Sequence, residues 1–374
     1  MCTNIFINKG GYHVEARSMD FPINMGTELV MGFVGQKNSS NPIVDADQIT
    51  AGQLSTWTNK YGYVGRGAFN TAVVMDGMNT EGLSISILYL PHSIYASFNA
   101  ADKRPVLGAI EMPTFCLSQA KTVKEAHELI KSHQLVAWAI EASPGMFIKN
   151  VPVHFCVRDK TGDSMVVEFI GGEVKIYHPA GNVMTNAPAY DWQLDYAKHY
   201  SSINVSDEKP NEEMAQYVYK YNEIYPGALR PAVNNFMGLP GDYSPSSRFA
   251  KCTVLLDNLY APNSSAEAIY QSSIILNSAV VPYTPGNSPK TKITTTTLWC
   301  VIKDLDNSVM RFLDLAFFQA DMKLLPMSVD NGYKPLDLKS INFNAVPDEF
   351  AAKVITTNTR KDIKVVDVTQ VPGF

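Results

Sequence analysis

Pairs of strand-like segments joined by short turns occur near both ends of this chain, and they constrain its fold more than any other feature. Residues 3–8 alternate around two isoleucines, a turn with two glycines occupies residues 9–11, and residues 12–17 return. This pattern is typical of a β-hairpin. Residues 294–304 are rich in threonine, which suits a half-buried strand, and a turn leads into residues 308–315. The pattern predicts antiparallel sheets.

Helical patterns lie between these strand pairs. Thr122 and Glu125 form a capping box, and apolar residues at helical spacing follow up to residue 130. Residues 265–278 are predicted to be helical, and residues 191–221 have weak helical character. The remaining predicted strands are residues 28–36, 71–76, 83–88, 151–159, 164–170 and 173–178. We find no repeat or linker, and therefore expect a single domain over residues 1–374, of the α+β class with helical layers on antiparallel sheets.

Composition argues against several classes of partner. The 374 residues are 45% hydrophobic and 18% charged, which is ordinary for a globular chain. Lys and Arg number 31 against 36 Asp and Glu, so the net charge is −5, and no long basic run occurs. We therefore expect no nucleic-acid partner and no membrane partner. No signal peptide is recognised, which predicts a cytoplasmic protein, or a periplasmic one if Met1 stands where a leader was removed.

The five cysteines and seven histidines are scattered along the chain. No CxxC pair occurs, so a disulfide framework is not expected. His154 and Cys156 fall on one face of a predicted strand, where core packing is a better interpretation than metal binding. We expect neither a metal nor an organic cofactor.

Cys2 occupies a position that becomes the N-terminus when the initiator methionine is removed. If the first hairpin turns at residues 9–10, Cys2 pairs with Arg17. If it turns at residues 10–11, Cys2 pairs with Met19 instead. The sequence leaves both registers open, and either one brings Arg17 close to Cys2.

This grouping suggests nucleophilic chemistry. A guanidinium such as that of Arg17 stabilises a neighbouring thiolate, and the carboxylate of Asp20 can orient a free α-amino group. That amine can then serve as the base for the thiol of the same residue, as it does for N-terminal threonine. The alternative is that Cys2 is incidental and that Arg17 and Asp20 form a surface ion pair.

Several motifs make the nucleophilic interpretation more specific. The chain opens with MCT, and ARSMDF follows at residues 16–21. Further motifs are GMNTEGLSISILYLP at residues 77–91, VMTNAPAYDWQ at 183–193, GLPGDYSPSSRF at 238–249 and TTTTLWCVIKDLDNSVMRF at 294–312. In this order the motifs resemble the choloylglycine hydrolase family, which includes bile salt hydrolases and penicillin V acylases and belongs to the N-terminal nucleophile hydrolases. They span residues 2–312, and residues 313–374 are expected to complete or extend the same domain.

The resemblance implies a four-layer αββα fold and a set of roles. Cys2 would attack an amide carbonyl, Arg17 would face its thiolate, and Asp20 would orient its amine. The backbone N–H of Asn79 and the side-chain amide of Asn186 would form an oxyanion hole. Arg248, expected on a loop made rigid by two prolines at residues 240 and 245, would bridge the polar network. As alternatives, the two asparagines could be turn formers, and Arg248 a structural ion-pair partner.

The resemblance also implies the substrate class, a small N-acyl amide cleaved through a thioester. The ARSMD segment favours penicillin V acylase activity, with N-acyl homoserine lactones as possible further substrates. Bile salt hydrolysis, acyl transfer and a non-catalytic binding role are the alternatives. Phe21, where one branch of the family carries tryptophan, would line the acyl pocket, and position alone suggests Trp57 and Tyr61 as its other wall. A homotetramer is expected from the same resemblance.

Overall fold

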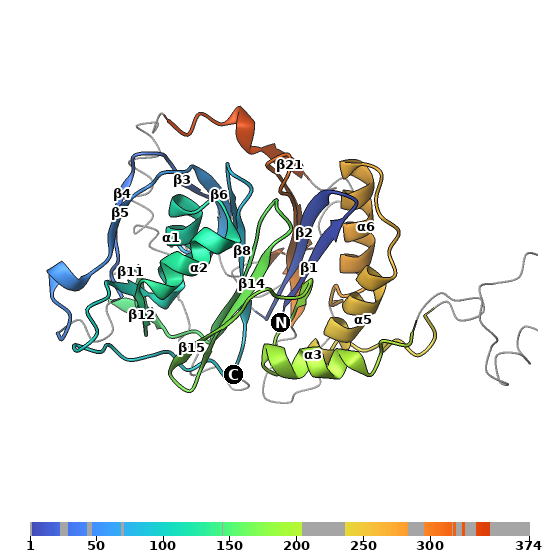
Figure 1. Ribbon diagram of the computed structural model, residues 1–374, viewed down its shortest axis with the longest axis horizontal. Helices are drawn as coiled ribbons and strands as arrows, with labels where there is room; N and C mark the ends of the chain where they lie inside the picture. Colours follow the sequence, from blue (N-terminus) through green and yellow to red (C-terminus); the bar gives the residue numbers. More distant parts are fainter. Residues whose placement is uncertain are drawn as a thin grey trace, which may run out of the picture.

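The structure, a computed structural model, describes residues 2–22, 29–42, 47–68, 71–143, 145–203, 236–282, 295–315, 317–318, 324–325 and 334–344. Figure 1 shows two sheets packed face to face, with helices on the outer side of each. Helices α1 and α2 cover one sheet, and α5 and α6 cover the other. The four-layer αββα arrangement predicted from the sequence is confirmed.

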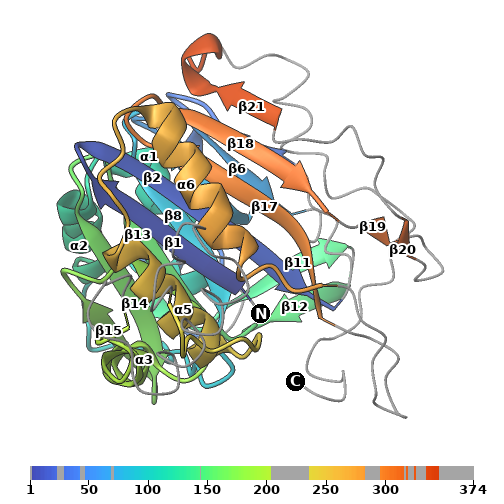
Figure 2. The ribbon, with the colours of Figure 1, turned by 90° about the vertical axis from the view of Figure 1, so that its right-hand side faces the viewer.

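The first sheet has six strands in the order β16-β1-β2-β17-β18-β21. Figure 2 shows α5 and α6 lying across it. Its paired strands are antiparallel, and two of them come from the first hairpin. The bounds are β1 Cys2–Lys9, β2 Tyr12–Phe21, β16 Val183–Met184, β17 Thr296–Asp304, β18 Val309–Asp314 and β21 Lys334–Asp337.

The second sheet has seven antiparallel strands in the order β15-β14-β13-β8-β7-β6-β3. Their bounds are β3 Leu29–Gly32, β6 Tyr63–Gly67, β7 Val74–Asn79, β8 Ser84–Tyr89, β13 Val153–Arg158, β14 Ser164–Ile170 and β15 Glu173–Tyr177. Small two-stranded sheets pair β4 Lys37–Ser39 with β5 Thr56–Thr58, β9 Val106–Gly108 with β10 Gln134–Val136, β11 Ala139–Ser143 with β12 Met146–Lys149, and β19 Phe317–Phe318 with β20 Leu324–Leu325.

Five α-helices and three short 3-10 helices are described along these ranges. The α-helices are α1 Met112–Gln119, α2 Val123–Lys131, α3 Tyr190–Lys198, α5 Pro245–Asp257 and α6 Ser265–Asn277. The 3-10 helices are η1 Ala51–Gln53, η2 Ala109–Glu111 and η3 Leu338–Ser340. Thr122 caps α2 by accepting a hydrogen bond from the backbone N–H of Glu125, as its capping sequence predicts.

The turn of the first hairpin settles the register that the sequence left open. Gly10 and Gly11 have φ angles of +65° and +78°, which favour glycine over other residues. The turn is therefore centred on these two glycines, and Cys2 pairs with Met19.

Two predicted elements differ from the observed ones. The strand expected over residues 28–36 is described only as Leu29–Gly32, because the chain turns next at Gly35, which has a φ of +82°. Helix is observed only over Tyr190–Lys198 of the region 191–221, and residues 204–221 lie outside the described ranges.

The segment expected to be a rigid loop around Arg248 is instead helix α5, and the loop prediction is wrong. Ser244 caps the helix by accepting a hydrogen bond from the Ser247 N–H. Pro245 occupies the first turn, where its missing N–H removes no helical hydrogen bond. Arg248 therefore projects from a regular helix that packs on β1 and β16.

Two hydrophobic clusters hold the layers together. One joins the six-stranded sheet to α5 and α6 and includes Cys2, Phe6 and Trp299. The other joins the seven-stranded sheet to α1 and α2 and includes Phe115 and Phe155. Each sheet lies between the other sheet and a layer of helices, so most residues on both of its faces are buried. Cys2 is among these buried residues.

Candidate active site

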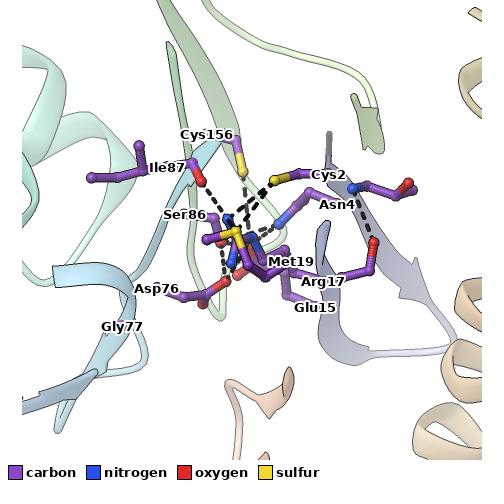
Figure 3. A network of polar contacts seen from close by, with 12 residues as sticks. Cys2, Asn4, Glu15, Arg17, Met19, Asp76, Gly77, Ser86, Ile87 and Cys156 are labelled. Atoms are coloured by element: carbon purple, nitrogen blue, oxygen red, sulfur yellow. Dashed lines mark hydrogen bonds and ion pairs between the residues drawn. The ribbon is translucent and has the colours of Figure 1, made fainter. Parts of the chain in front are cut away.

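Cys2 begins β1, and its side chain meets a row of residues on the neighbouring strand β2. Glu15, Arg17 and Met19 alternate along β2 and therefore share one face. Nη2 of Arg17 donates to Cys2 Sγ over 3.4 Å, and Cys2 Sγ lies 3.7 Å from Met19 Sδ (Figure 3). The predicted contact between Arg17 and the thiol is present, with the guanidinium fully buried.

Arg17 is held on several sides. Nη2 also donates to the backbone carbonyl of Ile87 over 2.6 Å, and Nε lies 3.4 Å from Asp76 Oδ2 (Figure 3). The indole ring of Trp299 lies 4.6 Å from the guanidinium carbon, at a cation–π distance. These contacts, from three different strands, fix where the positive charge sits relative to Cys2 Sγ.

Behind Arg17 lies a buried group of charges between the two sheets. Lys303 Nζ contacts Asp76 Oδ1 and lies 3.0 Å from Glu15 Oε2, and Ser86 Oγ lies within hydrogen-bonding distance of both carboxylates. Burial raises the pKa of Asp76 above its usual 3.8, although Lys303 and Arg17 oppose this. Burial also acts to lower the pKa of Lys303, but the two carboxylates outweigh it and raise that pKa. Two cations and two anions thus balance each other in the core.

Asn186 contacts the backbone nitrogen of Cys2. The Cys2 N–H donates to Asn186 Oδ1 over 2.6 Å, and Asn186 Nδ2 donates to the backbone carbonyl of Tyr89 over 2.7 Å. Gln193 Nε2 donates to the backbone carbonyl of Asn186 over 2.6 Å. The asparagine side chain is therefore fixed at both ends of its amide.

Arg248 connects the same residues from α5. Its Nη1 donates to the Cys2 carbonyl over 2.5 Å and contacts Thr3 Oγ1, while Nη2 donates to Asn186 Oδ1 over 2.8 Å. Nη1 also lies 3.8 Å from Asp20 Oδ2. Burial lowers the pKa of Arg248, and Asp20 and Cys2 oppose that change, so the guanidinium stays charged.

Asp20 lies near the end of β2 and is fully buried. Thr297 Oγ1 donates to Asp20 Oδ1 over 2.6 Å, which orients the carboxylate. The structure thus groups Cys2, Arg17, Asp20, Asn186 and Arg248 from four separate parts of the sequence, with Arg17 and Asp20 both on β2.

Asn79 is not part of this group, and the role predicted for it requires correction. Its backbone N–H donates to the Leu83 carbonyl, and its side chain donates to the carbonyls of Leu117 and Ala120. Asn79 follows Met78, which pairs with Ser84 at the start of β8. The carbonyl that accepts from Arg17 belongs to Ile87, about 10 Å farther along β8. Asn79 closes a turn and anchors α1, which was the alternative considered from the sequence.

The residues expected to line an acyl pocket lie in different parts of the fold. Phe21 follows Asp20 and is buried in the cluster that contains Cys2. Trp57 packs edge-on against Phe115 with ring centroids 5.1 Å apart, and the Tyr61 N–H donates to the Ser118 carbonyl. Phe115 and Ser118 belong to α1, on the outer face of the seven-stranded sheet, so Trp57 and Tyr61 do not form a wall together with Phe21.

Sequence reasoning missed the part of the site that comes from β8. The carbonyls of Ile87 and Tyr89 accept hydrogen bonds from Arg17 and Asn186. A signal was present, because ILYLP is the last part of the motif that contains Asn79, but the identity of a residue does not show whether its backbone carbonyl accepts a hydrogen bond. The buried charges of Asp76 and Lys303 were also missed, since their separation in sequence hides their contact.

Within the described ranges, no three His, Cys, Asp or Glu side chains gather in a way that could hold a metal ion. His154 Nδ1 lies 3.0 Å from Glu168 Oε1, and Cys156 packs in the core near Glu15. No described helix combines the length and apolar character needed to cross a bilayer.

The fold defines the structural class of this protein. Two solved structures share the fold over 92% of this chain: penicillin V acylase from Agrobacterium tumefaciens, with a TM-score of 0.66, 22% identity and 88% of that chain covered, and a variant of conjugated bile acid hydrolase from Clostridium perfringens, with a TM-score of 0.71, 19% identity and 94% covered. The chain therefore has the fold of these two enzymes.

Sequence comparison gives the family. Residues 2–312 match the linear amide C–N hydrolases, choloylglycine hydrolase family, and the chain belongs to this family. Penicillin V acylase from Pectobacterium atrosepticum is 30% identical over 235 residues, which is 59% of this chain and 59% of that protein's length. Bile salt hydrolase/transferase from Clostridium perfringens is 25% identical over 301 residues, which is 75% of this chain and 79% of that protein.

Proposed function

We propose that this protein hydrolyses the linear amide of a small N-acyl substrate, with Cys2 as the nucleophile and its own α-amine as the base. One observation carries the proposal: Cys2 Sγ contacts Arg17 while the Cys2 nitrogen is bonded to Asn186. The nucleophilic atom and the basic atom of one residue are thus each held by a different buried partner. A cysteine that merely filled space would not need either contact.

The chemistry begins when removal of the preceding residue or leader frees the Cys2 amine. The neutral amine takes the thiol proton, and the thiolate, stabilised by Arg17, attacks the amide carbonyl carbon. The carbonyl oxygen becomes an oxyanion. Asn186 Nδ2 has two N–H donors, and because one binds the Tyr89 carbonyl, the other can stabilise this oxyanion.

Collapse of the tetrahedral intermediate breaks the C–N bond, and the ammonium of Cys2 gives its proton to the departing amine. The acyl group remains on sulfur as a thioester. A water molecule then gives a proton to the Cys2 amine, and the hydroxide attacks the thioester. The carboxylic acid leaves as the thiolate is re-formed and protonated. Arg248 holds the Cys2 carbonyl throughout these steps, and Asp20 lies 3.8 Å from the same guanidinium nitrogen.

A buried aromatic ring close to the nucleophile supports a hydrophobic acyl group. Phe21 follows Asp20 on β2 and lies in the hydrophobic cluster that contains Cys2. We propose that this ring contacts a phenoxyacetyl or long aliphatic acyl group, which favours penicillin V and N-acyl homoserine lactones over bile salts.

The test compares three substrates side by side: penicillin V, a long-chain acyl homoserine lactone and glycocholate. We expect hydrolysis of the first two at rates that Cys2→Ser reduces by at least about 10³-fold, because serine lacks a thiolate. Cys116→Ser, in the other hydrophobic cluster, is the matched control and should keep the wild-type rate. Activity of the Cys2→Ser protein would contradict the nucleophile, and preference for glycocholate would contradict the substrate class.

Acyl transfer is a second candidate function. The Clostridium perfringens relative carries the name hydrolase/transferase. A thioester on Cys2 reacts with an amine as it does with water, and the acceptor decides the product. Adding glycine to the penicillin V assay and measuring phenoxyacetylglycine distinguishes the two. The expected homotetramer stays a prediction, which light scattering coupled to gel filtration can check.

A further inference from the structure

A second buried group of polar residues lies behind Asn186. His154, on β13, and Glu168, on β14, are both fully buried between the layers. His154 Nδ1 lies 3.0 Å from Glu168 Oε1, and His154 Nε2 lies 3.0 Å from the backbone carbonyl of Thr185. That carbonyl belongs to the peptide bond that joins Thr185 to Asn186.

The partners of the imidazole decide where its protons are. A carbonyl oxygen only accepts hydrogen bonds, so Nε2 must carry a proton. Glu168 Oε1 and Oε2 already accept the backbone N–H of Tyr190 at 3.0 and 3.2 Å, and the Tyr177 hydroxyl lies 3.5 Å from Oε2. A proton is therefore required between Nδ1 and Oε1 as well, since two lone pairs would repel each other there.

The segment around Asn186 is fixed on both sides of its side chain. On one side His154 holds the Thr185 carbonyl, and on the other Gln193 Nε2 holds the carbonyls of Asn186 and Pro188. Thr185 Oγ1 contacts Gln193 Oε1 and donates to the Pro245 carbonyl at the start of α5. Any rotation of the Asn186 backbone would therefore break at least one of these hydrogen bonds.

We propose that His154 is a positioning residue for Asn186: it holds a proton on Nε2 and shares a second with Glu168, and through the Thr185 carbonyl it fixes the peptide that carries the asparagine side chain. This rests on the proposed function of Asn186 beside Cys2. The histidine itself touches neither substrate nor the reacting atoms. Its effect is to keep Asn186 Oδ1 within bonding distance of the Cys2 nitrogen.

The proton assignment can be tested without any activity. Protein labelled with ¹⁵N in histidine should show one imidazole whose Nε2 carries a proton that exchanges slowly with water and whose Nδ1 has the chemical shift of a hydrogen-bonded nitrogen. The His154→Gln spectrum assigns those signals by their loss. An Nε2 of His154 without a proton, or an Nδ1 with the chemical shift of an unbonded ring nitrogen, would overturn the assignment.

Kinetics test the positioning role. His154→Leu removes the donor to the Thr185 carbonyl, whereas His154→Gln retains an N–H donor of similar reach. We expect kcat for penicillin V, expressed per titratable Cys2 thiol, to fall by about 10²-fold in the leucine variant with little change in KM, because small displacements of an aligned group have effects of that size. The glutamine variant should recover at least about tenfold of the loss.

A matched control separates positioning from folding. His133 is half-buried, bonds to Ser55 and the Leu129 carbonyl, and has no contact with the Asn186 segment. His133→Leu should lower the melting temperature but leave kcat per active thiol unchanged. If Cys2→Ser is inactive while His154→Leu keeps wild-type kcat, the positioning role is wrong and the proposed function stands. If Cys2→Ser is active, the proposed function is wrong, and the proton assignment is judged by the spectrum alone.

Discussion

The backbone nitrogen of Cys2 lies 2.6 Å from Oδ1 of Asn186, although 184 positions separate the two residues in the sequence. β1 and β16 are neighbours at the edge of the six-stranded sheet, and Asn186 is the second residue after β16. A local arrangement of strands thus brings an amide oxygen to the one nitrogen that would become basic after processing. Much of the chemistry proposed here depends on that contact.

Active protein is expected to begin at Cys2. While a residue precedes it, the Cys2 nitrogen belongs to a peptide bond and cannot accept the thiol proton. Intact-mass measurement of active protein should give a chain starting at cysteine, whether Met1 or a longer leader was removed. A variant with an uncleaved N-terminal extension should have no measurable rate, and the same extension removed by a protease that leaves cysteine first should restore it.

Asn186 and Asn79 are expected to respond differently to substitution by alanine. Asn186→Ala should lower kcat by about 10²–10³-fold, the usual effect of losing an oxyanion donor. Asn79→Ala removes two buried hydrogen bonds to α1 and should lower the free energy of unfolding by about 2 kcal/mol while leaving kcat unchanged. Denaturant titrations and initial rates of both variants provide the check, and a loss of kcat in the Asn79 variant would restore the role inferred from the motif.

The contrast between these two asparagines shows what the sequence could and could not predict. Turns such as Gly10-Gly11 and the cap at Thr122 depend on nearest neighbours, so their residues predict them. The motif containing Asn79 was found correctly, but a motif does not say which of its residues meets Cys2. That depends on how far β8 runs past the turn before it reaches Arg17, which is a property of the packed sheets.

Helix α5 illustrates the other kind of error. The segment GDYSPSSRF contains residues typical of turns, and its helix begins in the middle of them at Pro245. Serine followed by proline was a helix start signal, but it competes with the same letters in a loop. The fact that Arg248 is fully buried and meets Cys2, Thr3 and Asn186 could not be inferred locally, because these partners come from distant segments.

The activity is expected to fall at acidic pH because of Asp76. Burial raises the pKa of this carboxyl above 3.8, so it takes up a proton at a higher pH than an exposed aspartate. Above that pKa the Asp76 carboxylate is negative and balances the charge of Arg17, whose Nε lies 3.4 Å away. As the pH falls through the pKa of Asp76, the carboxylate takes up a proton, and Arg17 loses its anionic partner. Activity should therefore be lost in the direction of falling pH.

The pH profile of kcat/KM for Asp76→Asn provides the measurement. This variant mimics the protonated carboxyl, so we expect kcat/KM to be lower by about tenfold near neutral pH, as for one lost charged hydrogen bond, and the acidic limb to be weaker. Asp102→Asn removes a partly exposed aspartate paired with Arg104 and should keep the wild-type profile. An unchanged acidic limb in the Asp76 variant would assign that limb to another group.

Phe21 is expected to affect the choice of acyl group. Its ring is buried in the cluster with Cys2, one residue beyond Asp20. Phe21→Ala should lower kcat/KM for penicillin V by about tenfold, since losing some 50 Å² of apolar contact at about 25 cal/mol per Å² corresponds to about 1.3 kcal/mol. Bulky steroid amides such as glycocholate should lose less, because the enlarged site admits them. Phe115→Ala, an aromatic truncation in the other cluster, should lower stability without changing this ratio. Equal losses for both substrates in the Phe21 variant would place its ring away from the acyl group.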